Sequence, residues 1–387
     1  MPLSRIARPT PALLAYPMHG QYKLLSEGYR TRDGHLIEWA GRLTAGRGGV
    51  TVVSRPEPKA YFRRATGREP AFGTRSIDTT TWRLPDPRDR RRWWVRSLSA
   101  YPKLATAPDV PAIVWNPFCA LAPTERSPFG GGRAVTLDLL DDWTTHFAFQ
   151  GIRDEVEAAY RESFRRASFV TANGAGTEAL ARRFGRDDVT LVPNGCDAER
   201  FSRHSRATGP LTVGYVGKIG RRLDLTEVVT TISRLPELDF VFAGPFLDAG
   251  YREALEALPN VRLLLDVHYD SVPALLETFD VGWVPHRVGG GEVGGDVIKT
   301  YEYRAAGLPV LATPFEGVSD QGLDQVTVLP APAHAEHLRR LAARGPRVRR
   351  VPSALPAAAS WQHKTRAVLN NLGVLTTWPE PGDRTTP

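Results

Sequence analysis

The chain has 387 residues, a formal net charge of +8, and 42% hydrophobic and 24% charged residues. It is too long for one ordinary core, so two globular domains are expected. Its two cysteines, Cys119 and Cys196, exclude a disulfide framework or a cysteine-based metal cluster and favour a reducing, cytoplasmic setting. We expect no signal peptide, because Met1–Thr10 lacks an apolar core, and no membrane span, because no apolar run is long enough.

The positive charge alone does not indicate a nucleic-acid partner. No basic stretch carries a paired-cysteine finger or a ribonucleoprotein motif. Arginine, alanine and proline are abundant throughout, which is typical of a biased genome. We therefore expect no nucleic-acid binding, and leave anionic ligands or lipid headgroups as the alternative reason for the charge.

Short apolar or β-branched runs recur along the chain and predict strands. In the first half they are Ala12–Tyr16, Val50–Ser54, Ala112–Trp115, Ala134–Asp138, Ser168–Ala172 and Val189–Val192. In the second half they are Leu211–Val216, Asp239–Ala243, Val261–Leu265, Val281–Pro285, Pro309–Thr313 and Gln325–Leu329. Helical patterns lie between many of them: Asp154–Ala167, Gly176–Phe184, Thr226–Leu235, Tyr251–Leu258 and Val272–Thr278. This alternation predicts an α/β fold with parallel sheets covered on both faces.

Two sets of strands predict two doubly wound, Rossmann-like domains. A polar, punctuated stretch near 201–211 separates them, which gives an N-terminal domain over residues 1–205 and a C-terminal domain over 210–345. A helix over 357–373 has an apolar stripe and is expected to pack back across the junction. Ligands of such sheets bind at the carboxyl ends of the strands, so the site is expected in a cleft between the domains.

A glycine-rich loop followed by a short helix is the most informative segment. The loop is Gly289–Gly295, and Lys299 and Glu302 follow one turn apart on the predicted helix. Backbone N–H groups and a helix N-terminus suit a phosphate, while Glu302 suits a ribose diol. Only six of the 50 basic residues are lysines, which adds weight to Lys299. The alternative is a surface Lys–Glu pair.

The acid at the end of this loop excludes one phosphate-binding motif. Asp296 stands where a Walker loop has lysine. It is expected instead to be the N-cap of a helix that starts at Val297.

Three further segments follow predicted strands and carry polar side chains. Gly217, Lys218 and Arg222 lie in a glycine turn that fits phosphate but lacks dinucleotide-fingerprint spacing; the alternative is a plain turn with surface arginines. Asp142, Trp143 and His146 combine a carboxylate, an aromatic platform and an imidazole; the alternative is helix capping with a core tryptophan. His19 and Gly20 leave the first strand towards the cleft, unless they form a plain loop.

The remaining features of the sequence bear on metal binding and on contact with a membrane surface. The adjacent acids Asp141 and Asp142 do not share a helical face, and no D-x-D triplet occurs, so we expect no metal. The segment Arg88–Arg96 places arginines beside Trp93 and Trp94. It fits weak contact with an anionic membrane surface, an anionic acceptor site, or a solvated helix with Trp93 or Trp94 buried.

In combination, these residues resemble a GT-B glycosyltransferase, in particular the retaining enzymes of glycosyltransferase family four. The resemblance runs from about Ala134 to Val318. It rests on four segments: Thr171–Leu180, Val192–Phe201, Phe279–Pro285 and Lys299–Val310.

The resemblance implies roles for individual residues. Glu302 would hold the ribose hydroxyls, Lys299 and a base from the 218–222 turn the diphosphate, and the backbone near Val267–His268 the nucleobase. The family pattern has two glutamates eight positions apart, but Gly294 stands eight before Glu302. Glu292 or Asp296 would then replace the missing glutamate, with Gly294 and Gly295 in the same donor loop.

The function implied is transfer of a sugar from a nucleotide-diphosphate sugar to an acceptor hydroxyl, with retention and without a metal or other cofactor. Lys218, Arg222 and Lys299 would stabilise the leaving phosphate, and His146 or Asp142 would orient donor or acceptor. His19, Gly20 and Trp143 would contact the acceptor, a natural product or a glycan. The alternatives are a GT-B nucleotide-sugar epimerase or hydrolase, and a catalytically silent nucleotide-binding partner protein.

Overall fold

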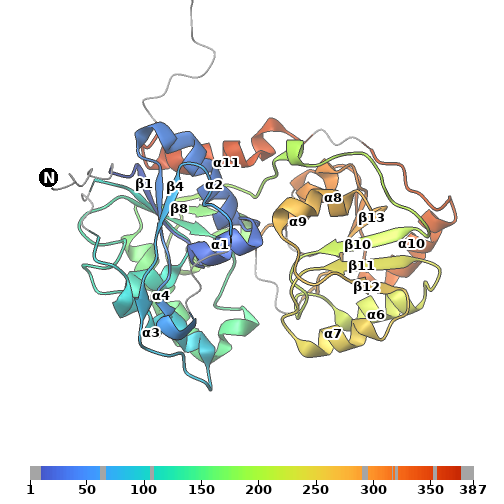
Figure 1. The fold of residues 1–387 in the computed structure, drawn as a ribbon, viewed down its shortest axis with the longest axis horizontal. Coiled ribbons are helices and arrows are strands. Elements are labelled where there is room, and N and C mark those ends of the chain that lie inside the picture. The colour runs from blue at the N-terminus through green and yellow to red at the C-terminus, as the bar shows by residue number, and fades with distance from the viewer. Residues whose placement is uncertain are drawn as a thin grey trace, which may run out of the picture.

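The computed structural model describes residues 10–61, 67–104, 109–289, 295–315, 317–318, 321–351 and 355–375. They form two lobes, each built on a parallel sheet with helices on both sides (Figure 1). This confirms the predicted α/β class with two doubly wound units. Among the described residues, none of the helices combines the length and the apolar character needed to cross a bilayer.

The N-terminal lobe contains a seven-stranded sheet in the order β4-β2-β1-β6-β7-β8-β9, parallel throughout. Four of its strands have every residue buried, because almost all their side chains are apolar. A separate pair, β3 and β5, lies outside this sheet. The strands are β1 Leu13–Tyr16, β2 Val50–Val53, β3 Glu57–Pro58, β4 Thr74–Ile77, β5 Thr80–Thr81, β6 Ala112–Val114, β7 Val135–Leu139, β8 Phe169–Ala172 and β9 Val189–Leu191. The helices are α1 Gln21–Glu27, α2 Arg32–Thr44, α3 Trp93–Arg96, α4 Arg153–Arg166 and α5 Ala175–Arg183.

The C-terminal lobe contains a six-stranded parallel sheet in the order β12-β11-β10-β13-β14-β15. The step from β10 to β13 is its switch point, where the chain begins to wind the other way. The strands are β10 Thr212–Val216, β11 Asp239–Ala243, β12 Val261–Leu263, β13 Val281–Val284, β14 Val310–Ala312 and β15 Val326–Val328. The helices are α6 Leu225–Ser233, α7 Ala249–Glu256, α8 Val272–Leu276, α9 Ile298–Ala305 and α10 His334–Ala342.

The last helix, α11 (Trp361–Asn371), returns to the N-terminal lobe. Figure 1 shows it beside α2, at the other lobe from α10, which precedes it in the chain. The ring of Trp361 stacks on that of His35, with ring centroids 4.6 Å apart. The backbone N–H of Cys196, in the crossover between the two sheets, donates to the Ala359 carbonyl just before the helix at 2.8 Å. The helix therefore contacts both α2 and the crossover.

Three local expectations need correction. Asp296 is not the N-cap of α9: Val297 holds that position, without a side-chain cap, and Asp296 precedes it. Both Trp93 and Trp94 are buried, rather than one of them, because the helix there is a single turn folded against the core. Strand β4 was missed, since its sequence Thr-Arg-Ser-Ile is polar and only half-buried, as befits an edge strand.

Candidate functional site

Lys299 and Glu302 lie on the face of α9 that is turned into the protein. The Lys299 Nζ is 3.4 Å from Nε2 of His286, which follows β13, and 5.0 Å from the ring centroid of Tyr215 in β10. A Cβ on Gly217 would lie 3.1 Å from the lysine Cε, so the glycine turn after β10 runs directly beside the lysine. Two segments separated by about 80 residues thus meet at the switch point, where doubly wound sheets bind ligands.

Burial shifts both ionisable groups towards their neutral forms. It lowers the pKa of Lys299 from 10.5 to about 7, and the nearby charge of Arg222 lowers it further, while Glu302 opposes the shift. Burial also raises the pKa of Glu302 from 4.5 to about 7, opposed by the Tyr269 hydroxyl and the charges of Lys299, Arg30 and Arg200. A cation in such a poorly solvated site is unfavourable, and a bound phosphate would relieve this.

Arg222 links this lysine to the N-terminal lobe. Its guanidinium forms an ion pair with Asp141, which follows β7, with an N–O distance of 3.4 Å. Its charge also lowers the pKa of His286, after burial and the charge of Lys299. Lys218, in the same turn as Arg222, is exposed. The structure thus brings together Gly217, Arg222 and Lys299, three of the residues predicted to bind the donor.

Gly295 lies directly against the N-terminal lobe. A Cβ at this position would lie 2.5 Å from the carbonyl oxygen of Leu140 and 2.7 Å from Oδ1 of Asp141, distances that no real Cβ tolerates. Only glycine therefore lets the start of the donor segment rest against the loop after β7. The other two members of the predicted loop, Glu292 and Gly294, lie outside the described residues.

In the loop after β7, the side chains of Asp142 and Trp143 are both engaged in contacts within the fold. Asp142 Oδ1 accepts hydrogen bonds from the backbone N–H of Thr144 at 2.9 Å and from its hydroxyl at 2.6 Å, and the other carboxylate oxygen pairs with Arg183. Trp143 is buried and stacks on Phe149, with centroids 5.0 Å apart. These contacts disfavour a direct role in the site for either residue: Trp143 lies in the core as the alternative expected, while Asp142 holds a turn and an ion pair rather than capping a helix.

His146 remains near the cationic groups. Its Nδ1 accepts the backbone N–H of Ala148 at 3.0 Å, so in the neutral ring the proton sits on Nε2. Burial lowers its pKa to about 4, helped by the charges of Arg222, Arg91 and Lys218. The ring is thus a neutral hydrogen-bond donor at physiological pH and not a general base.

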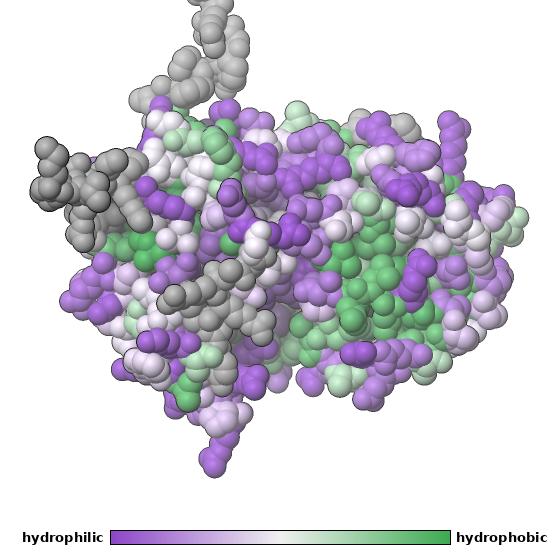
Figure 2. Space-filling model, in the orientation of Figure 1, coloured by the Kyte–Doolittle hydropathy of each residue, from purple (hydrophilic) through white to green (hydrophobic). Residues whose placement is uncertain are grey.

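A polar pocket opens where α1 begins. It has a volume of about 420 Å³, and its lining includes His19, Gly20, Lys23 and Arg55 from the N-terminal lobe and Asp266 from the C-terminal lobe. Burial lowers the pKa of His19 well below 6.5, aided by nearby cations. Gly20 is the N-cap of α1, so the predicted exit loop leads directly into a helix. The space-filling view in Figure 2 shows a recess between the lobes whose visible walls are largely hydrophilic.

The loop after β12 is anchored to the opposite lobe. Arg30 donates to the Val267 carbonyl at 3.2 Å and pairs with Asp266 at 2.9 Å. The His268 Nε2 lies 3.1 Å from the Leu25 carbonyl at the end of α1. The backbone predicted to meet the nucleobase is therefore positioned by both lobes.

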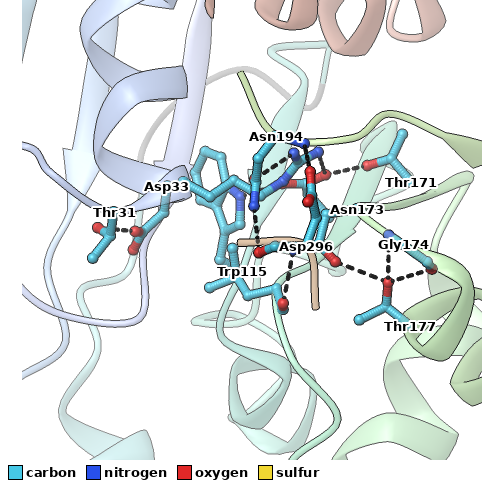
Figure 3. Close-up of polar contacts among 12 residues, drawn as sticks. Thr31, Asp33, Trp115, Thr171, Asn173, Gly174, Thr177, Asn194 and Asp296 are labelled. Atoms are coloured by element: carbon cyan, nitrogen blue, oxygen red, sulfur yellow. Dashed lines mark hydrogen bonds and ion pairs between the residues drawn. The ribbon is translucent and has the colours of Figure 1, made fainter. Parts of the chain in front are cut away.

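A buried polar network between the lobes was not foreseen (Figure 3). Arg32 at the start of α2 binds Asp138 in β7 through two nitrogens, at 2.8 and 2.9 Å, and both residues are almost fully buried. A third nitrogen of Arg32 donates to Oδ1 of Asn194 at 3.1 Å, and Asn194 in turn holds Asp296. The sequence signal was present, because a carboxylate inside the apolar strand β7 requires a buried partner.

The described residues contain no group of three or more histidine, cysteine, aspartate or glutamate side chains arranged to hold a metal ion. Asp296, one of the two candidates for the missing glutamate, has its carboxylate engaged by four hydrogen bonds. These bonds disfavour a direct contact between Asp296 and a sugar. The role of replacing the glutamate stays a prediction for Glu292.

Comparison with known proteins identifies the fold. No protein-family model matches the chain. A Bacillus subtilis protein with the name "Putative teichuronic acid biosynthesis glycosyltransferase TuaH" is 28% identical over 146 residues, which is 35% of this chain and 36% of that protein. The chain thus matches only about a third of that relative's length.

Solved structures match over nearly the whole chain. Sucrose-phosphate synthase from Thermosynechococcus elongatus aligns with a TM-score of 0.63 and 16% identity, covering 95% of this chain and 96% of its own. Anabaena HepE in complex with UDP and glucose aligns with a TM-score of 0.60 and 13% identity, covering 94% and 96%. A trehalose-phosphate synthase from Burkholderia xenovorans aligns with a TM-score of 0.61 and 14% identity, covering 96% and 100%. The chain therefore has the two-lobed GT-B fold of these proteins.

Proposed function

We propose that this GT-B chain is a glycosyltransferase that moves a sugar from a nucleotide-diphosphate sugar to an acceptor hydroxyl. The observation that carries the proposal is the meeting of Lys299, Arg222 and the Gly217 turn at the switch point of the second sheet. A buried lysine whose pKa is lowered to about 7 fits a diphosphate that restores its charge. The HepE structures contain UDP and UDP-glucose, so uridine nucleotides are the first donors to test.

Each residue has a defined part in this proposal. Lys299 and Arg222 bind the diphosphate and stabilise the negative charge that grows on it as the glycosidic bond breaks. Glu302, inward-facing and one turn from Lys299, accepts hydrogen bonds from the ribose hydroxyls. His146 donates from Nε2 to a sugar or acceptor oxygen. We propose retention of configuration without a metal, in which positioning and charge stabilisation supply the rate.

The acceptor and the cellular setting are further parts of the proposal. The relative's name refers to teichuronic acid biosynthesis, so we propose a glycan rather than a small natural product as acceptor. The pocket beside His19 and Gly20 is where we place it. Two buried, unpaired cysteines favour a cytoplasmic location.

We also propose weak contact with an anionic membrane surface. Trp82 and Leu84 are 79% and 56% exposed, and exposed arginines lie between and after them: Arg83, Arg88, Arg90, Arg91, Arg92 and Arg96. Exposed tryptophan and leucine among cations suit a headgroup layer. Co-sedimentation with phosphatidylglycerol vesicles should fall for Trp82→Ala and disappear with phosphatidylcholine vesicles; equal sedimentation in all cases would contradict the contact.

A donor assay with and without acceptor tests the function. UDP release from UDP-glucose or a related donor that requires an acceptor supports a transferase, whereas release without one supports a hydrolase. Conversion of the donor to an isomeric sugar supports an epimerase. Tight UDP binding without any turnover supports a silent binding protein. Lys299→Met should lower turnover sharply while the protein stays folded; near-normal transfer by this variant would refute the site.

A further inference from the structure

We infer that Asp296 and Asn194 are positioning residues that hold the donor helix α9 in register with the N-terminal lobe. The inference rests on the proposed function only for its kinetic consequence. Its structural content is a set of contacts across the crossover between the two sheets (Figure 3). None of these contacts is made by a side chain that we propose to bind the nucleotide-sugar.

The carboxylate of Asp296 is shared between the two lobes. One oxygen, Oδ1, accepts from the Val297 N–H at 2.8 Å and from the Gln321 amide at 2.5 Å, both in the C-terminal lobe. The other, Oδ2, accepts from the backbone N–H of Asn194 at 2.8 Å and from the Tyr301 hydroxyl at 3.0 Å. Four hydrogen-bond donors satisfy the Asp296 carboxylate, so removing the carboxylate would leave several of them without an acceptor.

The Asn194 side chain adds a second bond across the junction. Its Nδ2 donates to the Asp296 carbonyl at 2.8 Å, while its Oδ1 accepts from Arg32 at 3.1 Å. These two partners fix the orientation of the amide, since only the oxygen can accept and only the nitrogen can donate. The Asn194 amide therefore connects Arg32 on one side to the Asp296 backbone on the other.

Arg32 is itself immobilised. Its carboxylate partner, Asp138, also accepts from the Trp115 ring N–H at 2.6 Å and from the Thr171 hydroxyl at 2.5 Å. Because Arg32 and Asp138 are 3% and 1% exposed, the pair cannot exchange its bonds for water without opening the lobe. The network thus ends in the rigid core of the N-terminal sheet.

Asp296 lies three residues before Lys299, so its placement sets that of the donor helix. The N-cap of α9 makes no side-chain hydrogen bond, and the contact of Gly295 with the loop after β7 is a packing contact only. Without the Asn194–Asp296 bonds, α9 would keep its packing within the C-terminal lobe, but its position relative to the lobe that carries His146 would no longer be fixed. Donor would still bind, and its alignment with the acceptor would suffer.

The test uses Asn194→Ala, Asp296→Asn and the double variant. Asp296→Asn keeps an acceptor for Val297 but faces an N–H group towards the Asn194 N–H, so it removes that bond and leaves the Asn194 amide bond to the Asp296 carbonyl in place. We expect each single variant to lower kcat for UDP-glucose turnover about tenfold while the Kd for UDP changes less than about threefold. The double variant should be worse than either single one, because Asn194→Ala removes the amide bond to the Asp296 carbonyl and Asp296→Asn removes the separate bond from the Asn194 N–H.

Two control variants separate positioning from general destabilisation. Asn260→Ala removes an asparagine that bonds two backbone carbonyls, of Leu235 and Leu238, inside the C-terminal lobe. Tyr301→Phe removes one bond to Asp296 without touching the crossover. Both should leave kcat within about threefold of wild type after correction for folded fraction. Wild-type kcat in the double variant, or a loss of UDP affinity as large as the loss of kcat, would overturn the inference.

Hydrogen exchange keeps this test distinct from that of the proposed function. If the wild-type protein neither binds UDP nor turns over a donor, the proposed function fails. The amides of residues 296–305 should still exchange faster in Asn194→Ala than in Asn260→Ala, because their anchor to the other lobe is lost. Equal exchange in the two variants would refute the positioning role whatever the protein's activity.

Discussion

The pH dependence of donor binding should report directly on Lys299. In the free protein, burial lowers the pKa of this lysine to about 7, against an ordinary value of 10.5. A bound diphosphate places negative charge beside the amine and raises its pKa again. Above pH 7 the free lysine is mostly neutral and the bound lysine is charged. Binding therefore takes up a proton, and affinity falls as pH rises.

The magnitude follows from the size of the shift. While the free lysine is neutral and the bound one charged, each pH unit above about 7 costs about 1.4 kcal/mol of binding free energy, or a factor of about ten in Kd. Between pH 7.5 and 9 the Kd for UDP-glucose should therefore rise about thirtyfold. The fall ends where the pH reaches the pKa of the bound lysine.

Isothermal titration calorimetry in buffers of different ionisation enthalpy measures this proton uptake. UDP-glucose is the suitable ligand, because its diphosphate is esterified at both ends and holds no proton near neutral pH. Lys299→Met should bind more weakly at pH 7 and show neither proton uptake nor a slope above pH 7. Lys103→Met, at an exposed lysine, serves as the control and should behave as wild type.

The reasoning would be refuted by a Kd that is constant from pH 7 to 9 in wild type. It would equally be refuted by an unchanged slope in Lys299→Met. A slope that persists in that variant would assign the proton to another group, of which Glu302 is the nearest with a pKa near 7. That group loses its proton over the same pH range, so the variant comparison is essential.

Three further outcomes are expected from single substitutions. In wild type, the pKa of Glu302 is about 7 in the folded state and 4.5 in the unfolded state, so the folded state binds the proton more tightly. The contribution of this group to stability is therefore lost as pH rises from 4.5 to about 7. Urea unfolding of Glu302→Gln should lack that loss, of at most about 1.4 kcal/mol per pH unit. Arg32→Met leaves the Asp138 carboxylate buried without its cation and should reduce the free energy of unfolding by about 3–5 kcal/mol in denaturant titrations; a change below about 1 kcal/mol would contradict a tight ion pair. Gly295→Ala places a methyl group 2.5 Å from the Leu140 carbonyl and should lower kcat about tenfold with UDP affinity nearly kept; wild-type turnover would show that the lobes need not approach so closely.

The strands of both sheets were predictable because their chemistry is local. All twelve predicted runs became strands, each within two residues of the expected ends, since an apolar segment in a doubly wound sheet is buried on both faces. Strand β4 escaped because an edge strand needs no apolar run. The N-cap of α9 was misplaced by one residue, because Asp296 satisfies a donor of its own neighbour rather than one inside the helix.

For the candidate site, too, the residues within one short segment could be predicted, while the contacts between distant segments could not. Lys299 and Glu302 could be predicted because a glycine loop, a lysine and a glutamate occur within one short segment whose spacing alone places them on one helical face. The long-range partners of Asp138 and Asp296 could not, since Arg32 lies 106 residues from Asp138 and Asn194 lies 102 residues from Asp296. Only the fold creates those contacts. Yet the carboxylate of Asp138, which interrupts an apolar strand, indicated that some hydrogen-bond donor had to lie beside it. A buried charge without a local partner therefore predicts a long-range contact, and the one at Asp138 leads through Arg32 and Asn194 to the junction between the lobes.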